Sequence, residues 1–186
     1  MNTDNLRKPR IFTIGHSNLP IDGFVELLGR SSIRLVADVR SNPASVRYPW
    51  FERHALASKL ESGGLSYRWF RSLGGRRPNV RGQEIHTALE REEDRAYAEA
   101  MNSDDFTEAC GDLVGLAAST IAAVMCAEAD PEHCHRRLLA DKLFHMGVRV
   151  VHILGFDDAV EHVPTPGLLV SNDGRFIYEK NQLSLI

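Results

Sequence analysis

AAVMCAEADPEHCHRRLLADKLFHMG, residues 122–147, is the stretch that decides the fold, because two different hydrophobic patterns meet in it. An apolar run at residues 121–125 is typical of a buried strand, and residues 132–146 carry apolar positions at helical spacing. Asp130 can cap this helix, and Pro131 suits its first turn because the missing N–H costs nothing there. The stretch therefore predicts a strand followed directly by a helix.

The junction between this strand and this helix is dense in reactive side chains. They are Cys126, Glu128, Cys134, His135 and Arg136. The free amides and the dipole of a helix N-terminus attract anions, and a thiol close to them and to an arginine has a lowered pKa. We therefore expect a nucleophilic cysteine beside an anion site. Either Cys126 or Cys134 can be this nucleophile. The alternative is that both cysteines are small buried residues and that Arg136 is a surface charge.

Outside this stretch, apolar runs alternate with helical patterns. Strands are expected at residues 11–15, 33–39, 65–70 and 148–153, and helices at about 18–30, 50–61, 84–101 and from 103 onward. Apolar runs without strict alternation favour a parallel sheet that is covered on both sides. Asp173-Gly174 between two apolar triplets predicts a hairpin. The sequence therefore predicts an α/β fold, a mainly parallel sheet of about five strands with helices on both faces, plus a C-terminal hairpin.

Length and composition are those of an ordinary globular protein. We expect a flexible tail at residues 1–10 and a single α/β domain at 11–186. No run approaches the ~20 apolar residues of a membrane span, and the first ten residues lack the apolar core of a secretory signal. Three cysteines, an odd number, favour a reducing compartment. These features predict a cytoplasmic protein with no membrane partner.

The net charge of −3 hides a basic region from Arg30 to Arg81, which holds 11 Lys and Arg against 3 Asp and Glu. Ten of the basic residues are arginines, which suit forked contacts with phosphate or carboxylate. Aromatic residues are interleaved with them, so the region can bind nucleic acid through stacking and charge. The alternative is a solvated surface, with Trp69 and Phe70 packed in the core.

Polar clusters follow successive predicted strands and should lie together at the carboxyl ends of the sheet. Ligands bind there in open α/β folds. Beyond the junction residues, the candidates are His16, Ser17, Asp38, Arg40, Gly74, Gly75 and His152. We expect Arg40 and Arg136 to hold an anion, while His16 and Glu128 are candidates for proton transfer. The two glycines permit positive φ and close backbone approach to a ligand. Asp38 and Arg40 can alternatively pair with each other.

Short motifs of the chain together resemble the family called "domain of unknown function 488". The matching pieces are Ile14-Gly15-His16-Ser17, Asp38-Val39-Arg40-Ser41-Asn42-Pro43, Tyr67, Leu73-Gly74-Gly75, Met125-Cys126-Ala127-Glu128, Cys134-His135-Arg136 and His152-Ile153. The resemblance covers about residues 11–155 and leaves the C-terminal hairpin outside. It implies one domain and one site, and it gives no reaction.

Three hypotheses of function follow from these residues. The first is an enzyme that acts on a small anionic or nucleotide-like substrate with a cysteine nucleophile. Rhodaneses and Cys-dependent phosphatases are only an analogy for it, because the tight loop that joins their Cys to their Arg is missing here. The second is a module that binds nucleic acid or a nucleotide without catalysis. The third is a metal site made by Cys126, Cys134 and His135, with His16 or His152 as further ligands. No cofactor is specified by the sequence.

Overall fold

The computed structural model describes residues 8–78 and 85–180, and its centre is a six-stranded sheet in the order β3-β2-β4-β1-β5-β6. The strands are β1 (Arg10–Gly15), β2 (Leu35–Asp38), β3 (Ser66–Trp69), β4 (Ala122–Cys126), β5 (Arg149–Ile153) and β6 (Ala159–Glu161). The first five run parallel, and β6 pairs antiparallel with β5 at the edge. The mainly parallel sheet is therefore confirmed, with one antiparallel edge strand added to the five expected.

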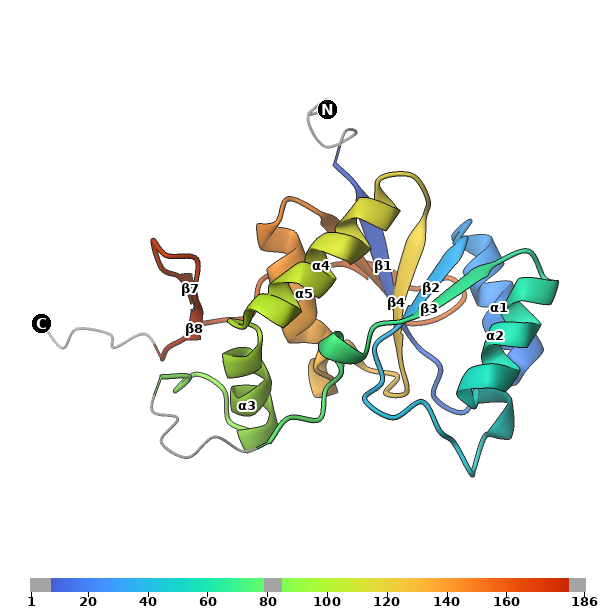
Figure 1. The fold of residues 1–186 in the computed structure, drawn as a ribbon, viewed down its shortest axis with the longest axis horizontal. Coiled ribbons are helices and arrows are strands. Elements are labelled where there is room, and N and C mark those ends of the chain that lie inside the picture. Colours follow the sequence, from blue (N-terminus) through green and yellow to red (C-terminus); the bar gives the residue numbers. More distant parts are fainter. Residues whose placement is uncertain (1–7, 79–84, 181–186) are drawn as a thin grey trace, which may run out of the picture.

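Helices cover both faces of this sheet, as expected. They are α1 (Ile21–Arg30), α2 (Arg53–Ser62), α3 (Glu92–Ala100), α4 (Asp104–Ala117) and α5 (Arg136–His145), with short 3₁₀ turns η2 (Pro49–Phe51), η3 (Arg71–Leu73) and η4 (Pro131–His133). Figure 1 shows α1 and α2 on one side of the sheet and α4 and α5 on the other. The chain moves along the sheet in one direction through α1 and α2, and returns through α4 and α5, so right-handed crossovers place the two sets on opposite faces.

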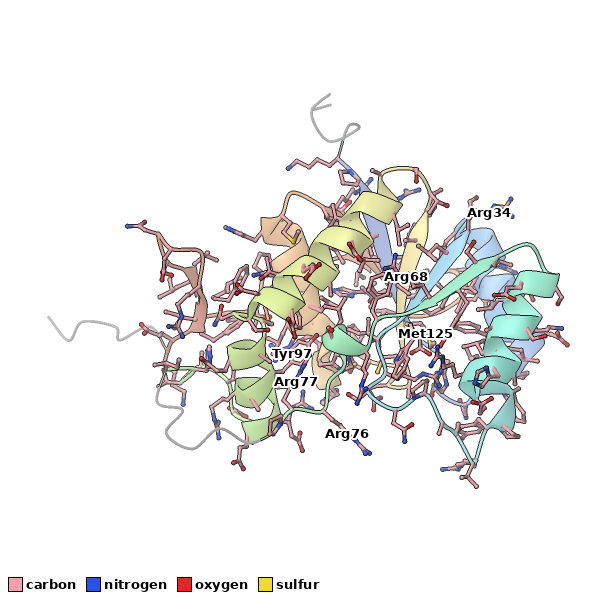
Figure 2. All side chains as sticks on the ribbon, viewed as in Figure 1. Arg34, Arg68, Arg76, Arg77, Tyr97 and Met125 are labelled. Carbon is pink, nitrogen blue, oxygen red and sulfur yellow. The ribbon has the colours of Figure 1, made fainter. Side chains whose placement is uncertain are left out.

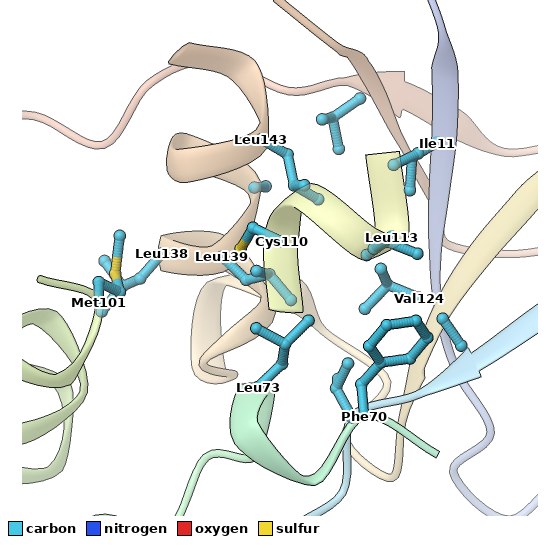
Figure 3. Packing of buried hydrophobic residues seen from close by; sticks show 14 of the residues in the cluster. Ile11, Phe70, Leu73, Met101, Cys110, Leu113, Val124, Leu138, Leu139 and Leu143 are labelled. Atoms are coloured by element: carbon cyan, nitrogen blue, oxygen red, sulfur yellow. The ribbon is translucent and has the colours of Figure 1, made fainter. Parts of the chain in front are cut away.

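Two apolar cores lie between the sheet and these helix layers. One joins Phe24, Leu28, Leu56 and Leu60 of α1 and α2 to the sheet. The other, drawn in Figure 3, packs α4 and α5 against the opposite face and includes Cys110, which is fully buried. All five residues of β4 are buried because helices cover both of its faces. Cys110 is thus a packing residue, as its helical spacing predicts.

The ends of the chain add smaller elements. The predicted hairpin is present as β7 (Leu168–Val170) and β8 (Phe176–Tyr178), with Gly174 at φ +81° in its turn.

The expected helix at 84–101 is shorter and begins at Glu92. The predicted flexible tail falls largely on residues 1–7, and Arg81 of the basic region falls on 79–84; both ranges lie outside the described residues. Among the helices that the structure describes, none has the length and hydropathy of a membrane span.

Candidate functional site

A pocket of about 1040 Å³ opens at the carboxyl ends of the central strands. It is lined by residues that follow β1, β2, β3 and β4, in agreement with the edge that the sequence predicts. β4 lies between β1 and β2, and its helix α5 leaves to one face, whereas α1 and α2 leave to the other. Loops that part to opposite faces leave a crevice between them, which is the usual ligand site of open α/β sheets.

The loops after β1 and β4 are bonded to each other along the floor of this pocket. His16 N donates to the carbonyl of Cys126 at 2.9 Å, and Ser17 N donates to the carbonyl of Ala127 at 2.9 Å. Gly15 makes this approach possible, because a Cβ there would overlap the Glu128 carbonyl. The pairing of Gly15 with Cys126 therefore holds His16 beside the cysteine loop.

Cys134 lies in a break between two helical segments and not inside a helix, which corrects the continuous helix expected at residues 132–146. Asp130 caps η4 by accepting from Glu132 N at 2.9 Å, as predicted for a cap, but Cys134 then adopts an extended backbone with φ −132° and ψ 146°. The helix α5 starts only at Arg136. Because of this break, the side chains of Cys134 and His135 both reach the pocket.

The Cys134 thiol lies between the side chains of Arg136 and His135. Arg136 Nε donates to its Sγ at 3.4 Å, and His135 Nδ1 lies 3.6 Å from the same sulfur. A hydrogen bond with Cys126 is the largest cause of a lowered pKa at Cys134; His135 and the Arg136 charge lower the pKa further, while burial opposes them. These causes favour the thiolate form at Cys134, although only 5% of the residue is exposed.

The pKa of Cys126 shifts in the opposite direction. Its pKa is raised by the hydrogen bond with Cys134 and by burial. The two sulfurs and His135 Nδ1 all lie within 4.8 Å of one another. The three residues named as a metal alternative are thus brought together.

His135 is held from both sides. Its Nε2 faces the Val39 carbonyl at 3.3 Å, so this nitrogen carries a proton and Nδ1 is free to face Cys134. Gly75 packs against the ring, which a Cβ would overlap, and a Cβ on Gly74 would come within 2.6 Å of Ser41 Oγ. Neither glycine has a positive φ, so that part of the expectation is wrong. Their close approach is to neighbouring loops of the protein, which positions the imidazole.

Arg40 is bound to Asp38, as the alternative interpretation of this pair proposed. Its Nη2 lies 2.6 Å from Asp38 Oδ2, and both residues are almost fully buried. Tyr67 OH also donates to Asp38 Oδ2 at 2.7 Å, and Arg40 Nη1 donates to the Phe51 carbonyl at 2.7 Å. The Arg40 guanidinium lines the pocket, but its charge is balanced by Asp38 and its donors are largely used.

His16 is neutral at physiological pH. Burial and the Arg40 charge lower its pKa to about 4, and its ring stacks on Phe51 with centroids 4.0 Å apart. Nδ1 faces the Ser17 carbonyl at 3.0 Å and so carries the proton, which leaves Nε2 as an acceptor 3.4 Å from Arg40 Nη1. His16 therefore presents an unprotonated nitrogen in the pocket wall.

Glu128 is exposed at the pocket, whereas Arg136 is buried. Glu128 is exposed on the pocket and its carboxylate accepts from Ala129 N at 3.0 Å. Arg136 is 1% exposed, so the alternative of a surface charge is wrong. Its Nη2 donates to the carbonyls of Glu128 and Ala129, and it is absent from the pocket lining. Arg136 thus lies behind Cys134 and holds the cysteine loop.

His152 is also absent from the pocket lining. It belongs to a buried polar chain in which Thr13 Oγ1 lies 2.7 Å from Nδ1 and His162 Nδ1 lies 3.0 Å from Nε2. His162 in turn bonds to Asp141, which also accepts from Tyr178 OH. This chain links β1, β5, α5 and β8 inside the protein.

Several arginines of the pocket were not predicted as site residues. They are Arg47, Arg76, Arg77 and Arg91. Arg91 pairs with Asp94 at 2.9 Å, whereas among the described residues no carboxylate pairs with Arg47 or Arg76. Arg77 lies over the Tyr97 ring, and Figure 2 shows Arg76 and Arg77 at the end of the sheet opposite Arg34. The basic region was a signal for them, but the sequence does not reveal which arginines converge.

The fold and this site define a class: an α/β protein with a cysteine-bearing, arginine-lined pocket at the carboxyl ends of a parallel sheet. The family model described as "Domain of unknown function DUF488" matches residues 20–143, and the chain belongs to this family. No curated protein and no solved structure matches the chain. The matched range contains Arg40 and Cys134 but not His16 or His152.

Proposed function

We propose that this protein is an enzyme that acts on a small anionic substrate, with Cys134 as a thiolate nucleophile. The observation that carries the proposal is the environment of Cys134 Sγ. This sulfur accepts a hydrogen bond from Arg136 Nε at 3.4 Å, and His135 Nδ1 lies 3.6 Å from it. A cysteine that becomes a thiolate through such neighbours is the activated form used in covalent catalysis.

The arginines around the thiolate support an anionic substrate. Arg47 and Arg76 line the pocket without a carboxylate partner among the described residues, so their charges are available to a ligand. Arginine binds phosphate and carboxylate with paired N–H groups. These side chains would hold the anionic group near the sulfur, while Arg40 stays bound to Asp38.

Three groups that line the pocket can move a proton. His135 Nδ1 faces the thiol directly, His16 offers an unprotonated Nε2, and Glu128 is exposed on the pocket. Imidazole and carboxylate are suited to general acid–base work near neutral pH. We assign proton exchange with the thiol to His135, because its Val39 contact fixes Nδ1 toward the sulfur.

The test compares two alkylating reagents that differ in charge, iodoacetate and iodoacetamide, at each cysteine by mass spectrometry. Cys134 should react at pH values well below the ordinary thiol pKa of about 8.5, and it should favour the anionic reagent relative to a free thiol in solution. Cys110 is the internal control, because burial raises its pKa to about 12. Slow reaction of Cys134 at every pH would refute the thiolate, and an ordinary reagent preference would refute the anion site.

A second candidate function is a soft metal site, favoured by one observation. The two sulfurs and His135 Nδ1 lie within 4.8 Å of one another, and Cys and His are ligands of Zn²⁺. The Arg136 charge beside Cys134 opposes a bound cation. Zinc bound stoichiometrically to wild-type protein, and lost in Cys134→Ser, would favour this candidate over the nucleophile.

The basic region gives weaker support to nucleic-acid binding. Its charges are divided between the pocket and the rest of the surface, where Arg30 pairs with Glu26 and Arg68 pairs with Asp112. Of the two aromatic residues that the alternative places in the core, Phe70 is buried there and Trp69 is half-buried. Binding of a small anion in the pocket therefore accounts for the pocket arginines better than binding of a nucleic-acid strand does.

A further inference from the structure

The Cys126 thiol has no role in a reaction that needs one nucleophile, yet it lies beside the Cys134 thiolate. Its sulfur, the Cys134 sulfur and His135 Nδ1 fall within 4.8 Å of one another. Cys126 is the last residue of β4, and Cys134 lies in the extended break before α5, so both approach the pocket from fixed elements. Both thiols are free and nearly buried.

We propose that Cys126 is a second catalytic residue, the resolving thiol of a thiol–disulfide exchange that Cys134 begins on a small anionic disulfide. This inference rests on the proposed role of Cys134 as nucleophile. It assigns the reaction class, a two-electron reduction of the substrate, and it assigns the substrate class, a disulfide that carries carboxylates.

The first step forms one sulfur–sulfur bond and breaks another. The Cys134 thiolate attacks one sulfur of the substrate disulfide, and the other half of the substrate leaves as a thiolate. The product is a mixed disulfide on Cys134. The arginines of the pocket would hold the carboxylates during this attack, since Arg47 and Arg76 lack a carboxylate partner among the described residues.

The second step uses Cys126. Its thiol loses its proton to the neighbouring imidazole of His135, and its sulfur attacks Cys134 Sγ. The bond between Cys134 and the substrate breaks, and the second substrate half leaves as a thiolate that takes up the proton. Two protein thiols are thereby oxidised to one disulfide, and one substrate disulfide is reduced to two thiols. A small thiol reductant restores the protein by the reverse exchange.

The arrangement of the two thiols favours this order of events. Arg136 Nε donates to Cys134 Sγ at 3.4 Å and Cys134 lines the pocket, so the attack on substrate falls to Cys134. After that attack the thiolate charge is lost, and Cys126 lies next to the electrophilic sulfur of the mixed disulfide.

The experiment treats reduced wild-type protein with glutathione disulfide, a disulfide with carboxylates, and follows mass and disulfide mapping over time. The wild-type chain should lose two hydrogens and contain a Cys126–Cys134 bond, with release of two glutathione thiols. Cys126→Ser and Cys126→Ala should stop at a glutathione adduct on Cys134. Cys134→Ser should form neither product, and Cys110→Ala should behave as the wild type.

The outcomes separate this inference from the proposed function. A stable glutathione adduct on Cys134 of the wild type, with Cys126 still reduced, would overturn the resolving role and keep the nucleophile. A wild type that does not react at Cys134 would overturn both. A bond that joins Cys134 to Cys110 would also overturn the inference, because Cys110 belongs to the core.

Discussion

At the scale of single residues, Arg136 is one cause of the difference between the two cysteines of the site, because it donates a hydrogen bond to Cys134. Both are nearly buried, so burial alone would keep both thiols protonated. Arg136 Nε reaches Cys134 Sγ, and its Nη2 is bound to two carbonyls of the cysteine loop. The guanidinium is thereby held at one sulfur, which makes Arg136 a positioning residue for the thiolate.

Arg136→Gln should therefore raise the apparent pKa of Cys134 and slow its alkylation at neutral pH. The variant loses a charged donor in a buried position, so we also expect about 1–3 kcal/mol less stability. Arg136→Lys keeps the charge and should restore part of the reactivity. The pH profile of iodoacetamide alkylation separates this role from general destabilisation; identical profiles for the wild type and Arg136→Gln would contradict it.

Gly75 is the second residue whose effect on the thiol can be isolated. A Cβ at this position would overlap the ring of His135, so Gly75→Ala should displace the imidazole from Cys134 and reduce the rate of alkylation. Gly115→Ala, at an exposed position of α4, is the matched control, since nothing lies within 4 Å of its added Cβ. The control should gain roughly 0.5–1 kcal/mol of stability without a change in alkylation. Equal alkylation rates in both variants would show that the His135 position does not matter.

At the scale of elements, the sequence predicts the five parallel strands but neither β6 nor the shape of the cysteine loop. Apolar runs specify β4 and β5 locally, and capping by Asp130 was correctly predicted. The break at Cys134 depends on distant partners instead. His135 is held by the Val39 carbonyl and by the backbone of Gly75, which are far from it in sequence. A local helical pattern cannot contain this information, so the sequence predicts an unbroken helix.

The polar chain that joins β5 to α5 and β8 gives a prediction about stability and pH. Burial and the neighbouring His162 and Arg136 lower the pKa of His152 to about 4 from 6.5. Between these values the unfolded chain binds a proton that the folded chain excludes, so the free energy of unfolding should fall as pH decreases from 6.5 to 4. The loss should be on the order of 2 kcal/mol from this residue.

His152→Gln should flatten that pH dependence, as measured by urea unfolding at several pH values. The slope should not vanish, because His16 titrates in the same range with a pKa of about 4. His54→Gln is the control, since His54 is exposed on α2 and should leave the slope unchanged. A His152 variant with the wild-type slope would show that this buried chain does not control acid stability.

At the scale of the whole molecule, the strand order decides which loops meet. The sequence predicts a parallel sheet and polar residues after each strand, but the order β3-β2-β4-β1-β5 is not encoded in any one segment. It places β4 between β1 and β2, so the cysteine loop lies at the centre of the site. His152 lies inside the protein, because Thr13 of the neighbouring β1 and His162 contact its two ring nitrogens.

The convergence of arginines from separate loops makes the last prediction one about the whole pocket. Arg47 follows β2 and Arg76 follows β3, and both line the cavity without a carboxylate partner among the described residues. Arg47→Ala combined with Arg76→Ala should remove the preference of Cys134 for iodoacetate over iodoacetamide. It should also weaken protection of Cys134 by inorganic phosphate.

Arg34→Ala is the matched control for this double variant. Arg34 is an exposed arginine just before β2, at the end of the sheet opposite the pocket. It changes net charge without touching the pocket, so reagent preference and phosphate protection should stay as in the wild type. The preference should also decrease with salt, because the two guanidinium groups act through charge. Equal preference in the double variant and the control would mean that overall charge, and not the pocket, attracts the anion.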